Sequence, residues 1–337
     1  MKAAVFHGAG APLRIEDVAA PTAGRGELTV AVKHCGICGT DLHYTEDGTP
    51  VAPGSVIGHE FCGEVVEVGE GVTGWKEGDR VVSMPFVGCG TCAYCLAGSP
   101  VWCRQMRDHA SGRLSGGFAQ FTNVGAAGTV RLADGVSWEE AALVEPLAVG
   151  LHGLRRARLD AGANILVVGA GPVGLAVVAL ARAMGARRIV VTARSTRGAQ
   201  MALDMGATDF ITSDQDVRRE FRKMTGEAPD AVFECVGAPG MLDYCISLAP
   251  IHGKVVVLGG CMRPDQITPA HAMNKELDLI FALAYDLHDF KVSADLVARH
   301  RVDPARMITD RVGFDEFPQA FEALRQRTNQ CKVLLTP

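Results

Sequence analysis

Residues 165–175, ILVVGAGPVGL, decide the fold that we expect for this chain. Ile165–Val168 is a short apolar run typical of a buried strand, and the pattern G-x-G-x-x-G follows it directly. In this pattern the first glycine permits a tight turn, and the second lets the backbone approach a pyrophosphate. The third lets a helix pack closely on the strand, while the N-terminus of that helix offers N–H donors and the positive end of its dipole. The sequence therefore predicts a dinucleotide-binding turn made of Gly169, Gly171, Pro172, Val173 and Gly174.

Alternating strands and helices surround this turn. The pattern predicts helices at about 172–184 and 198–205, and strands at 189–192, 231–234 and 254–258. Such alternation is typical of a parallel sheet with helices on both faces. We therefore predict an α/β fold built on a doubly wound sheet.

The first ~145 residues differ, since they read as short strands separated by glycine-rich turns. Examples of these expected strands are 28–32, 62–68 and 80–83. Ser137 and Glu140 then form a capping-box pattern that opens a helix through AALVEPLAVGLHGLRRA. The last stretch, FDEFPQAFEALRQRTNQCKVLLTP, predicts a helix followed by a terminal strand. A chain of 337 residues has room for roughly two domains.

The composition excludes several classes of protein. Apolar residues make up 48% of the chain, charged residues 21%, and the formal charge of -5 gives no basic field for nucleic acid or anionic membranes. Glu16 and Asp17 interrupt any hydrophobic core of a signal peptide, and glycines and Pro172 break the uncharged stretch 161–181. The eleven cysteines, odd in number and clustered, favour thiolate chemistry in a reducing compartment. We therefore expect a cytoplasmic protein without a membrane segment.

The end of the second strand of the pattern indicates which dinucleotide binds. Folds that bind NAD usually place Asp or Glu there to accept from the ribose 2′-OH, but the strand IVVT is followed by ARSTR. A carboxylate ~4 Å from a 2′-phosphate would repel it by several kcal/mol at an effective dielectric constant near 20. Guanidinium groups reverse that sign. We predict NADP(H), bound by Ala193, Arg194, Ser195 and Arg197; the alternative is that the arginines are only solvated loop residues.

Four cysteines form the first candidate metal site. Cys89, Cys92, Cys95 and Cys103 stand in the spacing C-x2-C-x2-C-x7-C. Four thiolates this close suit a closed tetrahedral site, so we predict a structural zinc around which this lobe folds. Redox-active cysteines are the alternative.

The second candidate metal site is spread along the chain. It comprises Cys38, His59, Glu60 and Glu145. Mixed sulfur, nitrogen and oxygen ligands with a position left for water or substrate describe a catalytic zinc. Cys35 and Cys38 also form a C-x-x-C pair, and the residues alone leave open which of the two is the ligand.

These motifs together resemble the zinc-containing medium-chain dehydrogenase/reductase family over essentially the whole chain. The resemblance rests on GHE-x-x-G-x-V, the four-cysteine lobe, EPLAVGLH and VVGAGPVGL, and it is greatest to the polyol and butanediol dehydrogenase branch, including NADP(H) ketose reductases. It implies a GroES-like, mostly β catalytic domain at 1–147 and 286–337, with the zinc lobe at about 86–104. It also implies a Rossmann cofactor domain at 148–285.

The resemblance further implies roles for the residues of the second site. Cys38 and His59 would be ligands with Cys35 outside the site, Glu60 would be a third ligand, and Glu145 would ligate directly or through water. Asp41 would orient the zinc histidine. Thr40 would lie beside the substrate oxygen, and His43 at the outer end of a proton relay. Tyr44 and Tyr285 match substrate-pocket positions, but Ala284 replaces an arginine of the sorbitol dehydrogenases, which favours a smaller alcohol than a long polyol.

The function that we expect is zinc-dependent interconversion of a secondary alcohol and its ketone with NADP(H), with two zinc ions per chain. The protein would be a homotetramer, or a dimer, acting on a small-molecule alcohol or ketone. The alternatives are a zinc-free quinone or enoyl reductase on the same scaffold and a non-enzymatic zinc-binding protein. Metal content distinguishes these three.

Overall fold

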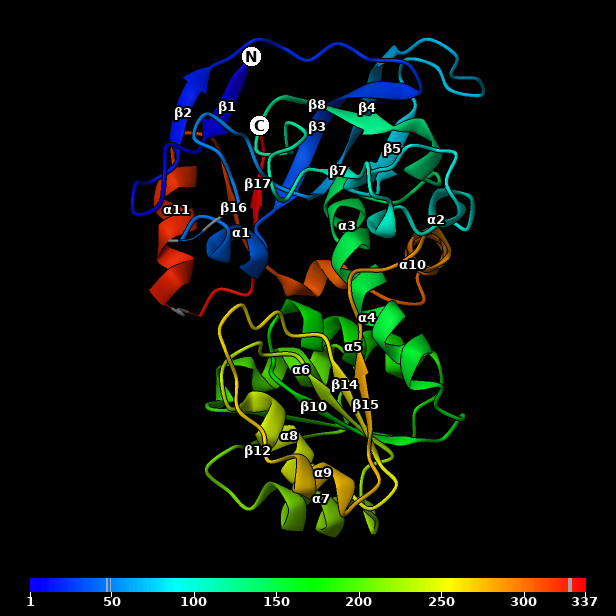
Figure 1. The fold of residues 1–337 in the computed structure, drawn as a ribbon, viewed down its shortest axis with the longest axis vertical. Helices are drawn as coiled ribbons and strands as arrows, with labels where there is room; N and C mark the ends of the chain where they lie inside the picture. Colours follow the sequence, from blue (N-terminus) through cyan, green and yellow to red (C-terminus); the bar gives the residue numbers. More distant parts are fainter. Residues whose placement is uncertain (47, 49, 327–328) are drawn as a thin grey trace. The chain divides into compact units, whose positions relative to one another are not determined.

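The computed structural model describes residues 1–46, 48, 50–326 and 329–337 (Figure 1). The chain forms two compact units: Met1–Glu145, Asp286–His300 and Ile308–Pro337 make the first, and Pro146–Tyr285 with Arg301–Met307 makes the second. Residues 301–307 thus lie in the second unit, whereas the expected boundaries put all of 286–337 in the first domain. One reason is that Arg306 Nη1 donates to the carbonyl oxygen of Asp204 at 3.0 Å.

The second unit is built on a six-stranded parallel sheet, so the expected α/β class is confirmed. Its strand order is β12-β11-β10-β13-β14-β15. The strands are β10 (Asn164–Val168), β11 (Arg188–Ala193), β12 (Asp209–Thr212), β13 (Ala231–Glu234), β14 (Lys254–Val257) and β15 (Asp278–Phe281). The helices are α5 (Pro172–Ala183), η3 (Thr196–Gly198), α6 (Ala199–Asp204), α7 (Val217–Thr225), α8 (Met241–Leu248), α9 (Pro269–Met273) and η4 (Pro304–Met307).

The strand order of this sheet reverses between β10 and β13. These two strands are neighbours although β11 and β12 come between them in the chain, and Val168 is paired with Glu234 at their carboxyl ends. In doubly wound sheets ligands bind outside the carboxyl ends of the strands at such a reversal. The Gly169 turn, which directly follows Val168, therefore lies where the fold places a ligand.

The first unit contains a seven-stranded sheet of order β16-β17-β3-β4-β5-β9, with β8 also paired to β3. The strands of this sheet are β3 (Glu27–Gly36), β4 (Glu60–Val68), β5 (Arg80–Ser83), β8 (Phe121–Gly125), β9 (Thr129–Arg131), β16 (Ile308–Val312) and β17 (Lys332–Leu335). Strand β1 (Lys2–Val5) pairs with β2 (Arg14–Asp17), and β6 (Phe86–Val87) pairs with β7 (Arg107–Asp108), in two separate sheets of the unit. The helices of the unit are α1 (Gly39–His43), α2 (Ala93–Leu96), η1 (Pro100–Trp102), η2 (Ala126–Gly128), α3 (Trp138–Ala142), α10 (Leu287–Ala298), α11 (Phe317–Ala323) and η5 (Leu324–Gln326).

The C-terminal segment completes this sheet. Strand β17 pairs antiparallel with β3, placing Leu335 opposite Cys35, and Figure 1 shows the red strand beside the blue one. An aromatic cluster fixes the neighbouring helix, because Phe118 lies 4.8 Å from Phe317 and 6.2 Å from Phe321 between ring centroids. Residues from the N-terminal and C-terminal parts of the chain thus form one hydrophobic core in the first unit.

The helix expected after Ser137 is interrupted. Ser137 caps α3 as predicted, since its Oγ accepts from the Glu140 amide at 3.2 Å. However, α3 ends at Ala142, Leu143 leaves the helical path, and α4 (Val144–Ala157) begins as a second helix. Pro146 explains the break, because it has no N–H and its ring crowds the carbonyl four residues earlier. Within the described residues, no helix is both long and apolar enough to cross a bilayer.

Candidate functional site

The four cysteines of the lobe converge in the first unit. The Sγ atoms of Cys89, Cys92, Cys95 and Cys103 all lie within 4.8 Å of one another. Backbone amides point at these sulfurs: Cys92 N donates to Cys89 Sγ, and Gln105 N donates to Cys103 Sγ, each at 3.4 Å. Amide donors stabilise thiolates, so the local backbone favours the charged form that binds metal.

The pKa values of two of these thiols diverge. Hydrogen bonds from Thr91 lower the pKa of Cys89 to about 6. Burial, together with hydrogen bonds to the other cysteines, raises the pKa of Cys95 to about 12. Cys95 therefore keeps its proton at neutral pH unless a cation offsets the repulsion from the neighbouring sulfurs. A tetrahedral, all-sulfur donor set suits Zn²⁺, so the residues present fit a closed structural zinc site.

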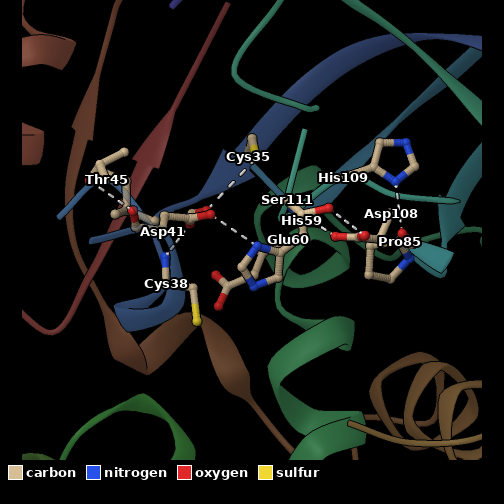
Figure 2. A network of polar contacts seen from close by, with 12 residues as sticks. Cys35, Cys38, Asp41, Thr45, His59, Glu60, Pro85, Asp108, His109 and Ser111 are labelled. Carbon is tan, nitrogen blue, oxygen red and sulfur yellow. Dashed lines mark hydrogen bonds and ion pairs between the residues drawn. The ribbon is translucent and has the colours of Figure 1, made fainter. Parts of the chain in front are cut away.

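The second site forms where β3 gives way to α1 and where β4 begins. Cys38 is the residue before α1, and His59 and Glu60 lie at the start of β4. One donor atom from each of these three side chains lies within 4.8 Å of the other two. Figure 2 shows the thiol, the imidazole and the carboxylate close together, with Asp41 joined to the His59 ring by a dashed line.

Asp41 connects two of these residues. Its fully buried carboxylate accepts from His59 Nδ1 at 3.0 Å through Oδ1 and from the Cys38 amide at 2.9 Å through Oδ2. This bond fixes the proton on Nδ1 and leaves Nε2 as the ring atom that can bind a metal. Asp41 thus occupies the place expected of a carboxylate that orients the zinc histidine.

The charge around His59 favours a cation. Burial opposes protonation of the ring, but the charges of Asp41 and Cys38 outweigh it and raise the pKa of His59 well above its ordinary value. A field that holds a proton on a buried imidazole also attracts a metal ion, whose binding displaces that proton. The donor set of thiolate, imidazole and carboxylate, with this charge, fits a catalytic zinc.

Cys35 lies outside this cluster. It is fully buried in the apolar core of the first unit, and burial raises the pKa of its thiol well above the usual range. A Cβ at Gly117 would lie only 2.8 Å from Cys35 Sγ, so the sulfur is closely surrounded. The fold therefore brings Cys38, and not Cys35, next to His59 and Glu60.

Lys332 is a residue of this site that the sequence analysis missed. Its Nζ donates to Glu60 Oε1 at 2.7 Å, to Glu60 Oε2 at 2.5 Å and to the Ile37 carbonyl at 2.9 Å. Lys332 is 0% and Glu60 1% exposed. Burial opposes the ammonium charge, but Glu60 outweighs it and raises the pKa of Lys332. The one signal in the sequence was a charged residue in the apolar terminal strand.

This ion pair needs a glycine beside it. A Cβ on Gly36 would lie 2.2 Å from Glu60 Oε2, so any side chain there would displace the carboxylate. Both oxygens of Glu60 are engaged by the ammonium group. A metal held by Cys38 and His59 would therefore share this carboxylate with Lys332.

The other predicted residues of the first unit do not join the three-residue cluster. Glu145 is buried in the first turn of α4, but its carboxylate is not among the donors that converge within 4.8 Å. Thr40 is half-buried on α1, and the exposed His43 places Nδ1 3.7 Å from a Glu46 oxygen. Tyr44 follows α1, and burial raises the pKa of its hydroxyl. Their roles stay predictions.

The predicted cofactor residues lie together in the second unit. Gly169 has a φ of +110°, and a Cβ on Gly174 would lie 2.0 Å from the Gly169 carbonyl oxygen. A Cβ on Gly171 would meet nothing within 4 Å, so the backbone there stays open to a ligand. Pro172 and Val173 begin α5. Ala193 is the last residue of β11, and Arg194, Ser195 and Arg197 follow it, with Arg194 and Arg197 exposed. Tyr285 is buried in this unit.

Comparison with known proteins identifies the class. Residues 24–134 match the alcohol dehydrogenase GroES-like domain, and residues 172–299 match the zinc-binding dehydrogenase family. A sorbitol dehydrogenase of Bacillus subtilis is 32% identical over 100% of this chain and 97% of its own length. The chain belongs to the zinc-type medium-chain alcohol dehydrogenase family, in its polyol and butanediol dehydrogenase branch.

Solved structures agree on the fold. The 2R,3R-butanediol dehydrogenase of Bacillus subtilis has a TM-score of 0.89 and 33% identity, covering 100% of this chain and 99% of that one. A zinc-binding dehydrogenase of Sinorhizobium meliloti 1021 bound to NADP has a TM-score of 0.90 and 32% identity, covering 100% of this chain and 99% of that one. An alcohol dehydrogenase of Escherichia coli CFT073 complexed with NADH has a TM-score of 0.91 and 27% identity, covering 100% of this chain and 99% of that one. The predicted GroES-like and Rossmann architecture is confirmed.

Proposed function

We propose that this chain is a zinc-dependent, NADP(H)-using alcohol dehydrogenase that interconverts a secondary alcohol and its ketone by hydride transfer. The observation that carries the proposal is the convergence of Cys38, His59 and Glu60 within 4.8 Å in a member of this family. When bound, zinc supplies a Lewis acid for the substrate oxygen, and the nicotinamide supplies or accepts the hydride. Neither chemistry is available from protein side chains alone.

The chain's own residues hold and orient these groups. Cys38, His59 and Glu60 would hold the metal, with Glu145 acting directly or through water. Asp41 keeps the His59 ring in one tautomer through its 3.0 Å bond. Thr40 would receive the proton of the substrate alcohol, and His43, whose side chain is 42% exposed, would exchange it with water.

Metal content tests this proposal. We expect two zinc ions per purified chain by elemental analysis, one in the four-cysteine lobe and one at Cys38. A single zinc would contradict the proposal and favour a zinc-free quinone or enoyl reductase, or a structural zinc protein. Because these alternatives do not need the second site, the stoichiometry separates them from the dehydrogenase.

The preference for NADP(H) rests on the loop after β11. Relatives have been solved with NADP and with NADH, so family membership alone leaves the cofactor open. We expect the wild-type protein to have a higher kcat/KM with NADPH than with NADH. Arg194→Ala should reduce this preference about tenfold or more, since a charged hydrogen bond contributes about 1.5–3 kcal/mol. Arg188→Ala, at the opposite end of β11, is the matched control. A wild-type preference for NADH would contradict the proposal.

The substrate that we propose is a small diol or simple secondary alcohol. Ala284 lacks the guanidinium with which an arginine could bind a long polyol, and one relative is a butanediol dehydrogenase. Activity screened over diols, ketoses and simple ketones with NADPH tests this choice. Faster turnover of hexitols than of short diols would contradict it.

We further propose a cytoplasmic homo-oligomer, a tetramer or a dimer. All eleven cysteines are free thiols, as expected in a reducing compartment. Strand β15 is an edge of its sheet, and Phe281 and the nearby Leu283 are 60% and 56% exposed. An edge strand with exposed apolar side chains is suited to pairing with a second copy of the chain. Light scattering that gives the mass of one chain would contradict an oligomer.

A further inference from the structure

Glu234 is a buried acidic residue that the proposed chemistry does not use. It is the last residue of β13, 3% exposed, and it is paired with Val168 where the strand order of the sheet reverses. It therefore lies beside the start of the Gly169 turn, at the end of the sheet where doubly wound folds bind their ligands. Among the described residues, no cation lies within ion-pair distance of its carboxylate. A buried carboxylate without a cation needs hydrogen-bond donors instead.

The carboxylate finds these donors in the turn that follows its own strand. Its Oε1 accepts from the amides of Val236 at 2.7 Å and of Gly237 at 2.9 Å. The Glu234 carbonyl oxygen accepts in addition from the amides of Leu258 and Gly259, at 2.9 and 3.0 Å. Side chain and backbone of one residue thus fix the ends of β13 and β14 together. Charged acceptors of this kind make the stronger class of hydrogen bond.

The turn of residues 235–237, which Glu234 holds, packs directly against the Gly169 turn. A Cβ on Gly169 would lie 2.9 Å from Val236 Cγ2 and 3.2 Å from the Cys235 carbonyl oxygen, so the two turns touch through the glycine. The Cys235 amide also donates to the Val168 carbonyl oxygen at 2.9 Å. Because Val236 lies against Gly169, a displacement of Val236 would also displace Gly169.

The opposite side of the carboxylate is equally confined. A Cβ on Gly259 would lie 2.4 Å from Glu234 Oε2 and 2.2 Å from the Gly237 amide nitrogen. Gly237 itself has a φ of +67°, which favours glycine. Two glycines thus leave a space that the carboxylate fills, and the side chain has little freedom to take another position.

We propose that Glu234 is a positioning residue for the dinucleotide: it fixes the turn of Val236 and Gly237, and this turn fixes Gly169 in the conformation that accepts the pyrophosphate. The inference rests on the proposed function in that Gly169 must bind a dinucleotide. It adds a residue outside the glycine motif and outside the loop after β11. It assigns to Glu234 an effect on the affinity for both NADPH and NADH, since both share the pyrophosphate.

The experiment compares two carboxylates on the same pair of strands. Glu234→Ala removes the acceptor at the carboxyl ends of β10 and β13. Asp230→Ala is the matched control, because Asp230 Oδ2 accepts from the Asn164 amide at 2.7 Å at the amino ends of the same strands. Glu234→Gln keeps a carbonyl oxygen that can accept from both amides. Fluorescence titration of each full-length protein with NADPH and with NADH gives Kd, and thermal unfolding and zinc content are measured in parallel.

We expect Glu234→Ala to raise the Kd of both dinucleotides about tenfold or more, with zinc content unchanged and the KM for the alcohol nearly unchanged. Glu234→Gln should stay within about threefold of wild type. Asp230→Ala should lower thermal stability without changing Kd. Where Glu234→Ala does not fold, Val236→Ala serves instead, since it removes the contact with Gly169 and should raise Kd about threefold.

Several outcomes would overturn the assignment. Wild-type affinity in Glu234→Ala, or an equal loss of affinity in Asp230→Ala, would show that the carboxylate serves only the stability of the fold. A Glu234→Gln protein that binds as weakly as Glu234→Ala would overturn the assignment to the two amide hydrogen bonds, because glutamine keeps their acceptor. If Glu234→Ala does not fold and Val236→Ala is used instead, an unchanged Kd in Val236→Ala would likewise overturn the assignment. Failure of wild type to bind either dinucleotide would instead refute the proposed function, and the assignment with it.

Discussion

The two candidate metal sites of the first unit are built in opposite ways. The four sulfurs of the lobe come from residues 89–103, and their partners are backbone amides of the same loop. The site at Cys38 draws its donors from two segments and its charged partners, Asp41 and Lys332, from a helix and from the last strand. A closed metal site can be made by neighbours in sequence, whereas an open, mixed-ligand site needs the fold to hold it.

This difference predicts that substitutions in the lobe mainly lower the stability of the fold, whereas substitutions at the Cys38 site mainly lower the activity. Loss of a lobe cysteine should loosen the structure around it, because the proposed zinc would take the place of a hydrophobic core there. Loss of a Cys38-site ligand should leave the fold largely intact, because Asp41 and Lys332 already bind the remaining groups. Each of the following substitutions tests one side of this contrast.

Cys38→Ser should have the largest effect on activity. Lewis-acid stabilisation contributes several kcal/mol to such a reaction, so kcat should fall at least about 10³-fold, with one of two zinc ions lost. Cys35→Ser is the matched control from the same C-x-x-C pair and should keep both zinc ions. The measurements are steady-state kinetics and elemental analysis. If Cys38→Ser kept the second zinc and its activity, the assignment of the site would be wrong.

Cys92→Ser should affect stability first. A lost metal site belongs to the short list of changes that cost about 4 kcal/mol, which corresponds to a fall in Tm of roughly 10 °C for a unit of this size. The folded fraction should keep the zinc at Cys38 and turn over at a rate within about threefold of wild type. Differential scanning calorimetry and active-site zinc content measure this. A loss of activity equal to that of Cys38→Ser, at unchanged Tm, would abolish the contrast between the sites.

Lys332→Met should have a smaller effect that depends on zinc. Removing the ammonium leaves Glu60 buried and unpaired, at a cost of about 3 kcal/mol in the metal-free protein. A zinc ion beside Glu60 supplies another positive charge, so the loss should be smaller when metal is bound. Urea unfolding of chelator-treated and zinc-loaded proteins, each against wild type treated alike, gives both values.

The double variant Glu60→Gln/Lys332→Met is the control for this measurement. Because replacing both partners of a buried pair leaves no unpaired charge, it should recover most of the stability lost in Lys332→Met. An equal loss with and without zinc would show that the metal does not share the Glu60 carboxylate.

The parts predicted correctly from the sequence are those set by local chemistry. Strand β10, the Gly169 turn and α5 depend on neighbouring residues, and so does the capping of α3 by Ser137. The break at Leu143 was missed, because the apolar pattern hid the effect of Pro146.

The non-local features could not be predicted in the same way. The bond between Lys332 and Glu60 joins residues 272 positions apart, and no periodicity records such a pairing. Cys35 and Cys38 looked equivalent in sequence and differ only because β3 buries the first of them beside Gly117. Family resemblance supplied the choice of Cys38, and the structure supplies its physical reason.

The position of Lys332 on β17 also has a consequence for biosynthesis. A ribosome that adds ~5–20 residues per second needs roughly 15 to 55 s to pass from Glu60 to Lys332, a separation of 272 residues. During this interval the nascent first unit lacks both the strand that pairs with β3 and the cation that faces Glu60. The four-cysteine lobe, complete once residue 103 has emerged, can take up metal much earlier. If the chain binds two zinc ions as proposed, the lobe would therefore be loaded before the site at Cys38.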